Sequence, residues 1–315
     1  MKFRLHELTI DELNDLVESG EIDEFMRVCE LRQIKELSKV ADTICRKKHV
    51  RLILVAGGSS AGKTTTAKRL CTQLRVDFRS AIQISTDDYF VGDARNPKNP
   101  DGTFDYETVE AVDMERLARD LNALMAGETI HPRRFDFLLH EGFDAEQTLA
   151  LPKGGYIVLE GIHALNPRLT ENVPDASKFR VFIEPKSQLT IFAETKLSPM
   201  SGRLIRRMVR DNQFRKMSPL DTLDMWPKVL EGEDKWLNPF RGNADVEFDS
   251  GLLYELSVLR NYAAGLIELV RRRRPDDKKA FLFSELFQAI LSTSPNSVPG
   301  DSILREIIGG SQLQY

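Results

Sequence analysis

The stretch that decides the fold reads LILVAGGSSAGKT and spans residues 52–64. Its first five residues are all apolar, which predicts a short strand buried on both faces of a parallel sheet. The rest completes the pattern G-x-x-x-x-G-K-[ST], and a helical pattern follows from Thr64 to Leu74. A strand, a glycine-rich turn and a helix in this order are the context that a phosphate-binding loop requires. A chance glycine turn before a helix is the weaker interpretation.

The chemistry of this loop follows from its residue types. Glycines let backbone N–H groups turn inward around a phosphate without obstruction by Cβ, and the N-terminus of the following helix adds partial positive charge. Lys63 is expected to reach the terminal phosphates of a nucleotide, and the Thr64 hydroxyl is expected to ligate Mg²⁺. The predicted nucleotide-binding residues are Gly57, Gly58, Ser59, Ser60, Ala61, Gly62, Lys63, Thr64 and Thr65.

Two other apolar runs end in carboxylates. Residues 81–84 lead into Ser-Thr-Asp-Asp-Tyr, which contains Asp87, and residues 157–159 lead directly into Glu160. Ligands of open α/β sheets bind at the carboxyl edge of the strands, so both acids are predicted to lie beside the loop. There they suit a Mg²⁺ site and a general base for an attacking hydroxyl. The alternative is that each acid only caps the helix that follows it.

Residues 104–106 and 133–140 mix aromatic side chains with Asp, Arg and His. Such loops suit a planar base and a sugar, because rings stack on the base and carboxylates accept hydrogen bonds from sugar hydroxyls. Phe-x-Phe is nevertheless more often part of a core strand, and a single His is more often structural. These segments alone predict an acceptor site only weakly.

A basic segment covers residues 203–216, where six Lys or Arg stand against one Asp, a net charge of +5. Steps of three and four residues place four arginines on one face of a predicted helix. They are Arg203, Arg206, Arg207 and Arg210. We interpret this face as a phosphate-clamping lid, because only Asp211 is near enough in sequence to pair with it. Nucleic-acid binding by the same face is a third interpretation.

The composition of the 315 residues limits the function classes. Hydrophobic residues make up 41% and the net charge is −4, which allows a sizeable core and argues against a general nucleic-acid or anionic-membrane binder. No apolar run approaches the roughly 20 residues of a membrane span, and no signal peptide is evident. Cys29, Cys45 and Cys71 lack CxxC spacing, which disfavours a disulfide scaffold or a zinc site and favours the cytoplasm.

Strand and helix patterns alternate through the middle of the chain, which predicts an α/β fold with helices flanking a parallel sheet. Further elements are expected at residues 109–126 (helix) and 179–183 (strand), and Thr9-x-x-Glu12 has the form of a capping box. The expected division is a helical preface at residues 1–48, a P-loop domain at 49–275 with a helical lid at about 195–241, and a helical C-terminal extension at 276–315.

The order of these motifs resembles that of uridine/cytidine kinases. The matching segments are residues 57–64, 84–90, 104–105, 135–137, 159–162, 203–207 and 243–246. The chain is most similar to the branch whose longer members carry a threonyl-tRNA-synthetase-like TGS domain and a second additional domain ahead of the kinase. Residues 302–311 resemble the ending of that branch, and residues 1–48 resemble only the linker after the upstream domains.

The resemblance implies an NMP-kinase-like P-loop fold and ATP-dependent, Mg²⁺-dependent phosphorylation of uridine or cytidine at the 5′-hydroxyl, as in pyrimidine salvage. The implied catalytic residues are Asp87 as general base with Lys63, Arg203, Arg206, Arg207 and Arg210. The implied nucleoside contacts are Asp87, Tyr89, Asp105, Phe135, Phe137, His140 and Arg203. The implied Mg²⁺ ligands are Thr64, Glu160 and Asp87, and Asp245 is implied to lie close to the adenine.

Two departures from the family pattern leave the base specificity open: Phe135 stands where typical members have Tyr, and the loop after Asp105 lacks the usual His-Pro. One alternative is a kinase of the same architecture that acts on ribulose 5-phosphate or pantothenate. Another is a non-catalytic, nucleotide-dependent RNA-binding protein, in which Asp87 and Glu160 would be idle. No membrane or nucleic-acid partner is expected, and self-association is left open.

Overall fold

The computed structural model describes residues 7–99, 102–136, 139–191 and 196–314. Its central sheet has five strands in the order β11-β9-β2-β8-β3, and every neighbouring pair is parallel. The strands are β2 (Leu52–Gly57), β3 (Ala81–Ser85), β8 (Tyr156–Glu160), β9 (Lys178–Glu184) and β11 (Val246–Asp249). The predicted α/β fold with a parallel sheet is therefore confirmed.

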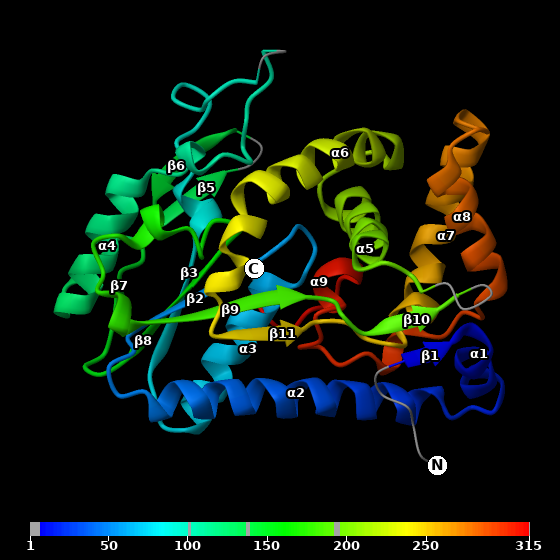
Figure 1. The fold of residues 1–315 in the computed structure, drawn as a ribbon, viewed down its shortest axis with the longest axis horizontal. Coiled ribbons are helices and arrows are strands. Elements are labelled where there is room, and N and C mark those ends of the chain that lie inside the picture. Colours follow the sequence, from blue (N-terminus) through cyan, green and yellow to red (C-terminus); the bar gives the residue numbers. More distant parts are fainter. Residues whose placement is uncertain (1–6, 100–101, 137–138, 192–195, 315) are drawn as a thin grey trace.

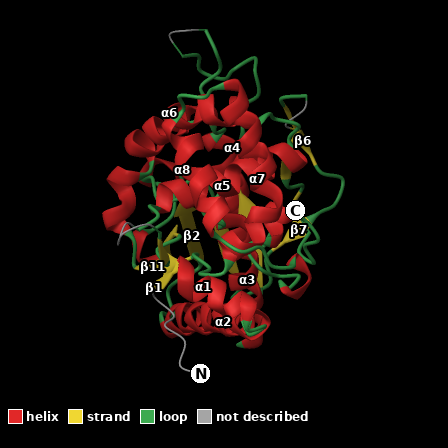
Figure 2. Ribbon diagram, turned by 90° about the vertical axis from the view of Figure 1, so that its right-hand side faces the viewer, coloured by secondary structure: helices red, strands yellow, loops and turns green. Residues whose placement is uncertain are grey.

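Alternate side chains of β2 enter two different cores. Ile53 belongs to the core beneath α2 (Ile22–Arg46) and α3 (Lys63–Val76). Leu54 belongs to the core beneath α4 (Met114–Ala126) on the other face of the sheet. Figure 2 shows the strands between these two helical layers. A strand covered on both faces needs apolar residues at successive positions, which explains the continuous run in the sequence.

The remaining helices build a third core at one end of the sheet. They are α1 (Ile10–Glu18), α5 (Pro199–Phe214), α6 (Pro219–Trp236), α7 (Glu255–Arg273), α8 (Lys278–Ala289) and α9 (Arg305–Ile308). In Figure 1 they surround the end of the sheet opposite α4. Across the described ranges, we find no helix whose length and apolar character would let it cross a bilayer.

The preface is helical, as expected, and also contributes a strand. The capping box forms: the Thr9 side chain accepts from the Glu12 amide while Glu12 bonds back to the Thr9 amide. Residues Glu7–Thr9 form β1, which pairs in parallel with β10 (Gln188–Thr190). Asn14 of α1 bonds both Ala289 O and the amide of Leu291 at 2.8 Å, so α1 is fastened to the other end of the chain.

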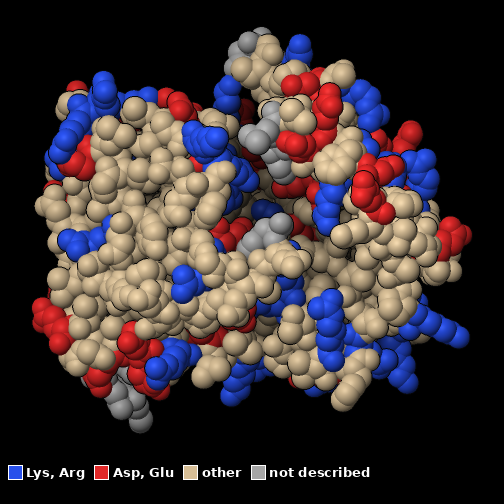
Figure 3. All heavy atoms as spheres, turned by 180° about the vertical axis from the view of Figure 1, so that it is seen from behind, with Lys and Arg blue, Asp and Glu red and all other residues tan. Residues whose placement is uncertain are grey.

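The segment between β3 and β8 departs most from the expected elements. The single helix predicted at 109–126 is a 3-10 turn followed by α4, because the Asp113 side chain accepts from the Arg116 amide and starts a new helix. Two small antiparallel pairs follow: β4 (Thr129–Ile130) with β7 (Leu149–Ala150), and β5 (Arg133–Asp136) with β6 (Glu141–Asp144). From behind, the surface is hollowed between the α5–α6 side and this hairpin side, and charged residues of both signs line the hollow (Figure 3).

Candidate active site

The glycine-rich loop leaves the carboxyl end of β2 and enters α3. Gly62 is the N-cap of α3, and its φ of 84° is a left-handed conformation that favours glycine. The Thr66 amide donates to Gly62 O at 3.0 Å, so the amides of Lys63 and Thr64 stand ahead of the hydrogen bonds within the helix. Lys63 Nζ lies over the loop and donates to Gly58 O at 3.1 Å. The N-terminus of a helix next to an ammonium group forms an anion site suited to phosphate.

Two carboxylates lie at the same edge of the sheet. Ser85 and Glu160 are partners in the parallel pairing of β3 with β8, so Asp87, in the turn after β3, lies near Glu160. Thr64 Oγ1 donates to Glu160 Oε1 at 3.1 Å. The structure therefore brings together the loop threonine and both strand-end acids that the sequence placed here.

Burial dominates the electrostatics of this edge. Glu160 is 3% exposed, and burial, followed by the nearby charge of Asp87, raises its pKa to about 7. Thr64, Glu160 and Asp87 offer oxygen ligands, and Mg²⁺ typically takes only one or two carboxylates together with water and phosphates. The residues thus fit a Mg²⁺ ion shared with a nucleotide. Among the described residues, no group of three or more His, Cys, Asp or Glu side chains is arranged to hold a metal ion by itself.

Two further carboxylates reach the site, and the sequence did not single them out. Glu233 of α6 accepts a hydrogen bond from the Ser59 amide at 2.8 Å and pairs with Arg203. Glu107 lies against α6, where a Cβ on Gly232 would come within 2.6 Å of the Glu107 Cβ, and burial raises the pKa of Glu107 to about 7. Both acids are far from the loop in sequence, so no pattern of neighbouring residues could predict that they lie beside it.

The arginine face of α5 lies directly on the glycine-rich loop. Arg203 Nε donates to Ser59 O at 2.9 Å, and Arg207 Nη1 donates to Ser59 Oγ at 2.7 Å. Arg203 packs so closely that a Cβ at Gly58 would overlap its guanidinium group. The sequence-based placement of these arginines near the phosphates is therefore consistent with the structure.

The expectation that only Asp211 could pair with these arginines is wrong. Arg203 pairs with Glu233 and Arg206 with Glu255, which lie 30 and 49 residues away in sequence. Asp211 is itself buried against Arg207 and Arg210, at 3.1 and 2.7 Å. Because the helices pack together, Glu233 and Glu255 come next to these arginines, although neither acid is close to them in sequence.

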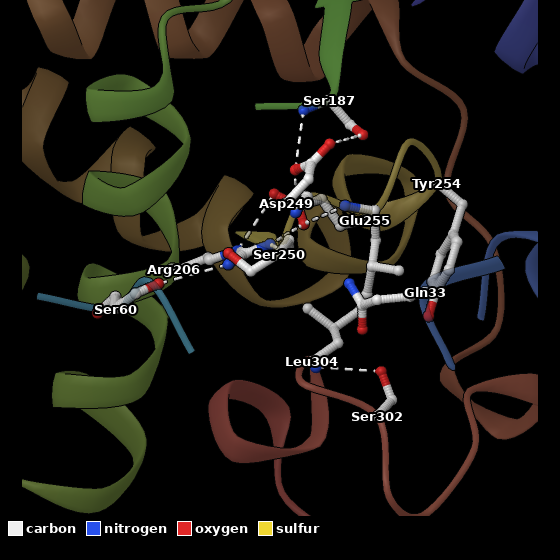
Figure 4. A network of polar contacts seen from close by, with 12 residues as sticks. Gln33, Ser60, Ser187, Arg206, Asp249, Ser250, Tyr254, Glu255, Ser302 and Leu304 are labelled. Carbon is white, nitrogen blue, oxygen red and sulfur yellow. Dashed lines mark hydrogen bonds and ion pairs between the residues drawn. The ribbon is translucent and has the colours of Figure 1, made fainter. Parts of the chain in front are cut away.

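Arg206 also departs from its expected role in closing over the phosphates. Its side chain is 1% exposed, and its guanidinium group bonds Glu255, Ser250 O at 2.9 Å and Ser60 O at 3.4 Å (Figure 4). These partners occupy the donors of the guanidinium group, because a buried cation needs both a counter-charge and hydrogen bonds. Arg206 holds the loop to the start of α7 and is not free to bind a ligand.

Polar side chains surround Tyr106 beside the β5–β6 hairpin, where the sequence predicted contacts with the molecule that accepts the phosphoryl group. The Tyr106 hydroxyl lies 2.7 Å from His140 Nδ1, and Asp93 Oδ1 lies 3.4 Å from the same nitrogen. His140 has a φ of 53° at the tip of the β5–β6 hairpin and is partly exposed. Asp105 accepts a hydrogen bond from the Glu107 amide at 3.0 Å. His140 thus contacts the Tyr106 hydroxyl, and Asp105 is the residue immediately before Tyr106 in the chain.

Other predicted acceptor contacts have different surroundings. Tyr89 is 1% exposed and donates to Asp120 Oδ2 at 3.0 Å, so the prediction that it touches the nucleoside is wrong. Phe135 is 7% exposed and stacks edge-on against Phe90 at 5.5 Å, as expected of a core strand. Phe137 lies outside the described residues.

Asp245 lies away from the site. It precedes β11, and its carboxylate binds Lys47 Nζ at 2.9 Å and the Arg180 amide at 2.8 Å. Parallel strands all begin at the edge of the sheet opposite the glycine-rich loop, and Asp245 stands at that beginning. The predicted contact with adenine is therefore wrong.

A parallel sheet that carries a phosphate loop after its central strand and two acids at the same edge is typical of a P-loop nucleotide-binding fold. The family model described as phosphoribulokinase/uridine kinase matches residues 52–256. The chain belongs to this family, and it is an ATP-dependent kinase.

The curated relatives that match this chain by sequence agree with this family. A uridine kinase of Deinococcus deserti is 28% identical over 210 residues, which are 66% of this chain and 92% of that protein. A uridine kinase of Brevibacillus brevis is 29% identical over 201 residues, 64% of this chain and 85% of that protein. The solved structure titled a possible uridine kinase from Bacillus stearothermophilus has a TM-score of 0.46 at 24% identity, covering 70% of this chain and all of that one.

Proposed function

We propose that this kinase transfers the γ-phosphoryl group of ATP to the 5′-hydroxyl of a pyrimidine ribonucleoside, uridine or cytidine, as in pyrimidine salvage. The observation that carries the proposal is the convergence of Asp87 and Glu160 on the Lys63–Thr64 end of the phosphate loop. A carboxylate at this edge suits a hydroxyl acceptor, because it can accept the proton that the hydroxyl loses. The uridine kinases among the relatives support a nucleoside as that acceptor.

In the proposed reaction the 5′-oxygen forms a bond to the γ-phosphorus, and the bond between that phosphorus and the β–γ bridging oxygen breaks. The 5′-hydroxyl proton passes to Asp87, and ADP leaves. Lys63 and the loop amides hold the phosphates, and Arg203 and Arg207 add positive charge beside Ser59. A Mg²⁺ ion held by Thr64, Glu160 and Asp87 would neutralise phosphate charge.

The acceptor is proposed to bind between the turn after β3 and the β5–β6 hairpin. His140 would read the pyrimidine edge and Asp105 the ribose hydroxyls, since His140 contacts the Tyr106 hydroxyl and Asp105, which precedes Tyr106 in the chain, bonds the Glu107 amide. The proposed location is the cytoplasm, and the proposal allows a homo-oligomer.

A release assay for ADP over the common nucleosides, ribulose 5-phosphate and pantothenate tests the proposal. Uridine or cytidine should give the largest kcat/KM; turnover only with ribulose 5-phosphate or pantothenate would overturn it. Asp87→Asn should lower kcat by about 10²–10⁴-fold with ATP binding retained. His140→Ala should raise the KM of the nucleoside and leave the KM of ATP unchanged, and equal changes in both would remove His140 from the base pocket.

A further inference from the structure

The C-terminal segment, defined as residues 298–314, lies beyond the family match, which ends at residue 256. It does not extend away from the kinase. Figure 1 shows it returning to the middle of the molecule beside α3, and the chain reaches Lys68 of that helix through Gln314 O. The segment therefore lies next to the phosphate loop and the start of α3, where it can influence how that loop is held.

Two contacts join this segment to the phosphate loop itself. Ile303 Cγ2 fills the space beside Gly62 and would lie 2.6 Å from a Cβ at that position. Glu306 Oε2 accepts a hydrogen bond from Thr65 Oγ1 at 2.6 Å, and Thr65 is fully buried. One contact is apolar and the other is charge-assisted, so the segment fixes both the turn and the first turn of α3.

The same segment is anchored in the core formed by the C-terminal helices. Leu304 and Ile307 are 1% and 0% exposed and belong to the core that also contains α5 and α7. A Cβ on Gly309 would lie 3.4 Å from the Phe214 ring at the end of α5. Arg305 donates to Val298 O and Pro295 O at 2.6 and 2.8 Å, which closes the segment on itself. Such burial describes a permanent part of the fold and not a removable lid.

The segment also packs against the arginine helix α5, where Gly309 adjoins the Phe214 ring. Figure 4 shows how α5 is in turn tied to the phosphate loop: Arg206 binds Glu255 and donates to Ser60 O. The Ser302 hydroxyl accepts from the Leu304 amide at 3.1 Å. The segment therefore lies between the two elements that must stay aligned for phosphate binding, α3 and α5.

We propose that the C-terminal segment is a fixed wall of the ATP site, in which Glu306 is a positioning residue that acts through Thr65. The first turn of α3 contributes amides without helical acceptors, and their direction decides how tightly a polyphosphate binds. Glu306 orients that turn from its outer side, and Ile303 holds the glycine turn in place. The inference rests on the proposed role of residues 57–65 as the ATP site.

The experiment measures the affinity for a fluorescent ADP analogue and the steady-state kinetics of the full chain. Glu306→Ala should weaken ADP binding about tenfold and raise the KM of ATP similarly, with little change in kcat or in the KM of the acceptor. Glu306→Gln keeps an acceptor for the Thr65 hydroxyl and should restore most of the affinity. Glu285→Ala, an exposed acid on α8, is the matched control and should bind as wild type does.

Unchanged affinity in Glu306→Ala would overturn the proposal, and so would tighter binding, since that would make the segment a plug. If Glu306→Ala fails to fold, Thr65→Val tests the same hydrogen bond and should weaken ADP binding to a similar degree; unchanged affinity would overturn the proposal. If Glu306→Ala folds, the double variant Glu306→Ala/Thr65→Val should bind ADP as weakly as Glu306→Ala alone. Additive losses of ADP affinity would contradict the proposal that Glu306 acts through Thr65. Lys63→Ala distinguishes a failure of this proposal from a failure of the proposed ATP site. If Lys63→Ala binds ADP as the wild type does, residues 57–65 are not the ATP site.

Discussion

Two groups of charged side chains flank the phosphate loop, and they are built in different ways. Glu160 is the last residue of β8 and Asp87 lies in the turn after β3, and both are placed by the pairing of those strands. The arginines of α5 stand on a helix, and acids from α6 and α7 fix their guanidinium groups. The first group depends on local sequence and strand register, whereas the second depends on how whole helices pack.

The difference teaches which residues do chemistry and which hold the site together. Asp87, in the partly exposed turn after β3, remains available to a substrate, but the buried guanidinium group of Arg206, which is paired and hydrogen-bonded, serves the fold. Variants of Asp87 and of Arg206 should therefore fail differently: the first in turnover and the second in stability.

The largest effect is expected at Lys63, which lies between the two groups. Lys63→Ala should lower kcat/KM for ATP by at least about 10²–10³-fold, because a charge that stabilises the transferring phosphoryl group is lost. The free energy of unfolding should stay near that of the wild type. Steady-state kinetics and urea denaturation measure the two quantities. Lys39→Ala, on the exposed side of α2, is the control, and a comparable loss of turnover there would contradict the assignment.

Arg206 should show the opposite behaviour. Arg206→Ala leaves Glu255 buried and unpaired, so the free energy of unfolding should fall by about 3–5 kcal/mol. Arg272→Ala removes an exposed pair with Glu268 and should cost less than about 1 kcal/mol. Urea denaturation of both variants compares them directly. If Arg206→Ala is as stable as the wild type but no longer binds ATP, Arg206 binds phosphate and does not mainly stabilise the fold.

Glu107 predicts a pH dependence of stability. Its pKa is 4.5 in an ordinary setting and about 7 in the folded chain, so between these values the folded state binds more protons than the unfolded state. The free energy of unfolding should therefore fall as the pH rises from about 4.5 to 7, by at most about 1.4 kcal/mol per pH unit for this group. Glu107→Gln should flatten that slope. Glu160 has a pKa raised in the same direction, so part of the slope should survive in the variant.

The smallest effect is expected at Asp245, which the sequence placed near the adenine and the structure places at the opposite edge of the sheet. Asp245→Asn should change the KM of ATP by less than about twofold while losing its ion pair with Lys47. Kinetics at varied ATP concentration provide the check. A tenfold rise in the KM of ATP would contradict the position described here.

The sequence predicted what depends on short spacing. The glycine-rich loop, the strands that carry Asp87 and Glu160, and the capping box at Thr9 were all found from neighbouring residues. It could not predict Glu233 or Glu107, because they reach the loop only when α6 has packed. The family resemblance implied a nucleoside contact for Tyr89, because the sequence alone could not show that Asp120, 31 residues away, accepts a hydrogen bond from the phenol in the core.

The contact between Asn14 and residues 289–291 has a consequence for how the protein is made. Ala289 lies 275 residues after Asn14 in the chain, so the side-chain amide of Asn14 cannot form this hydrogen bond until those residues have been synthesised. The strand pairing of β1 with β10 imposes a shorter wait of the same kind. Domains generally fold as units during synthesis. In this chain α1 can be secured only after residues 289–291 have been made, so the unit that must fold together spans almost the whole kinase.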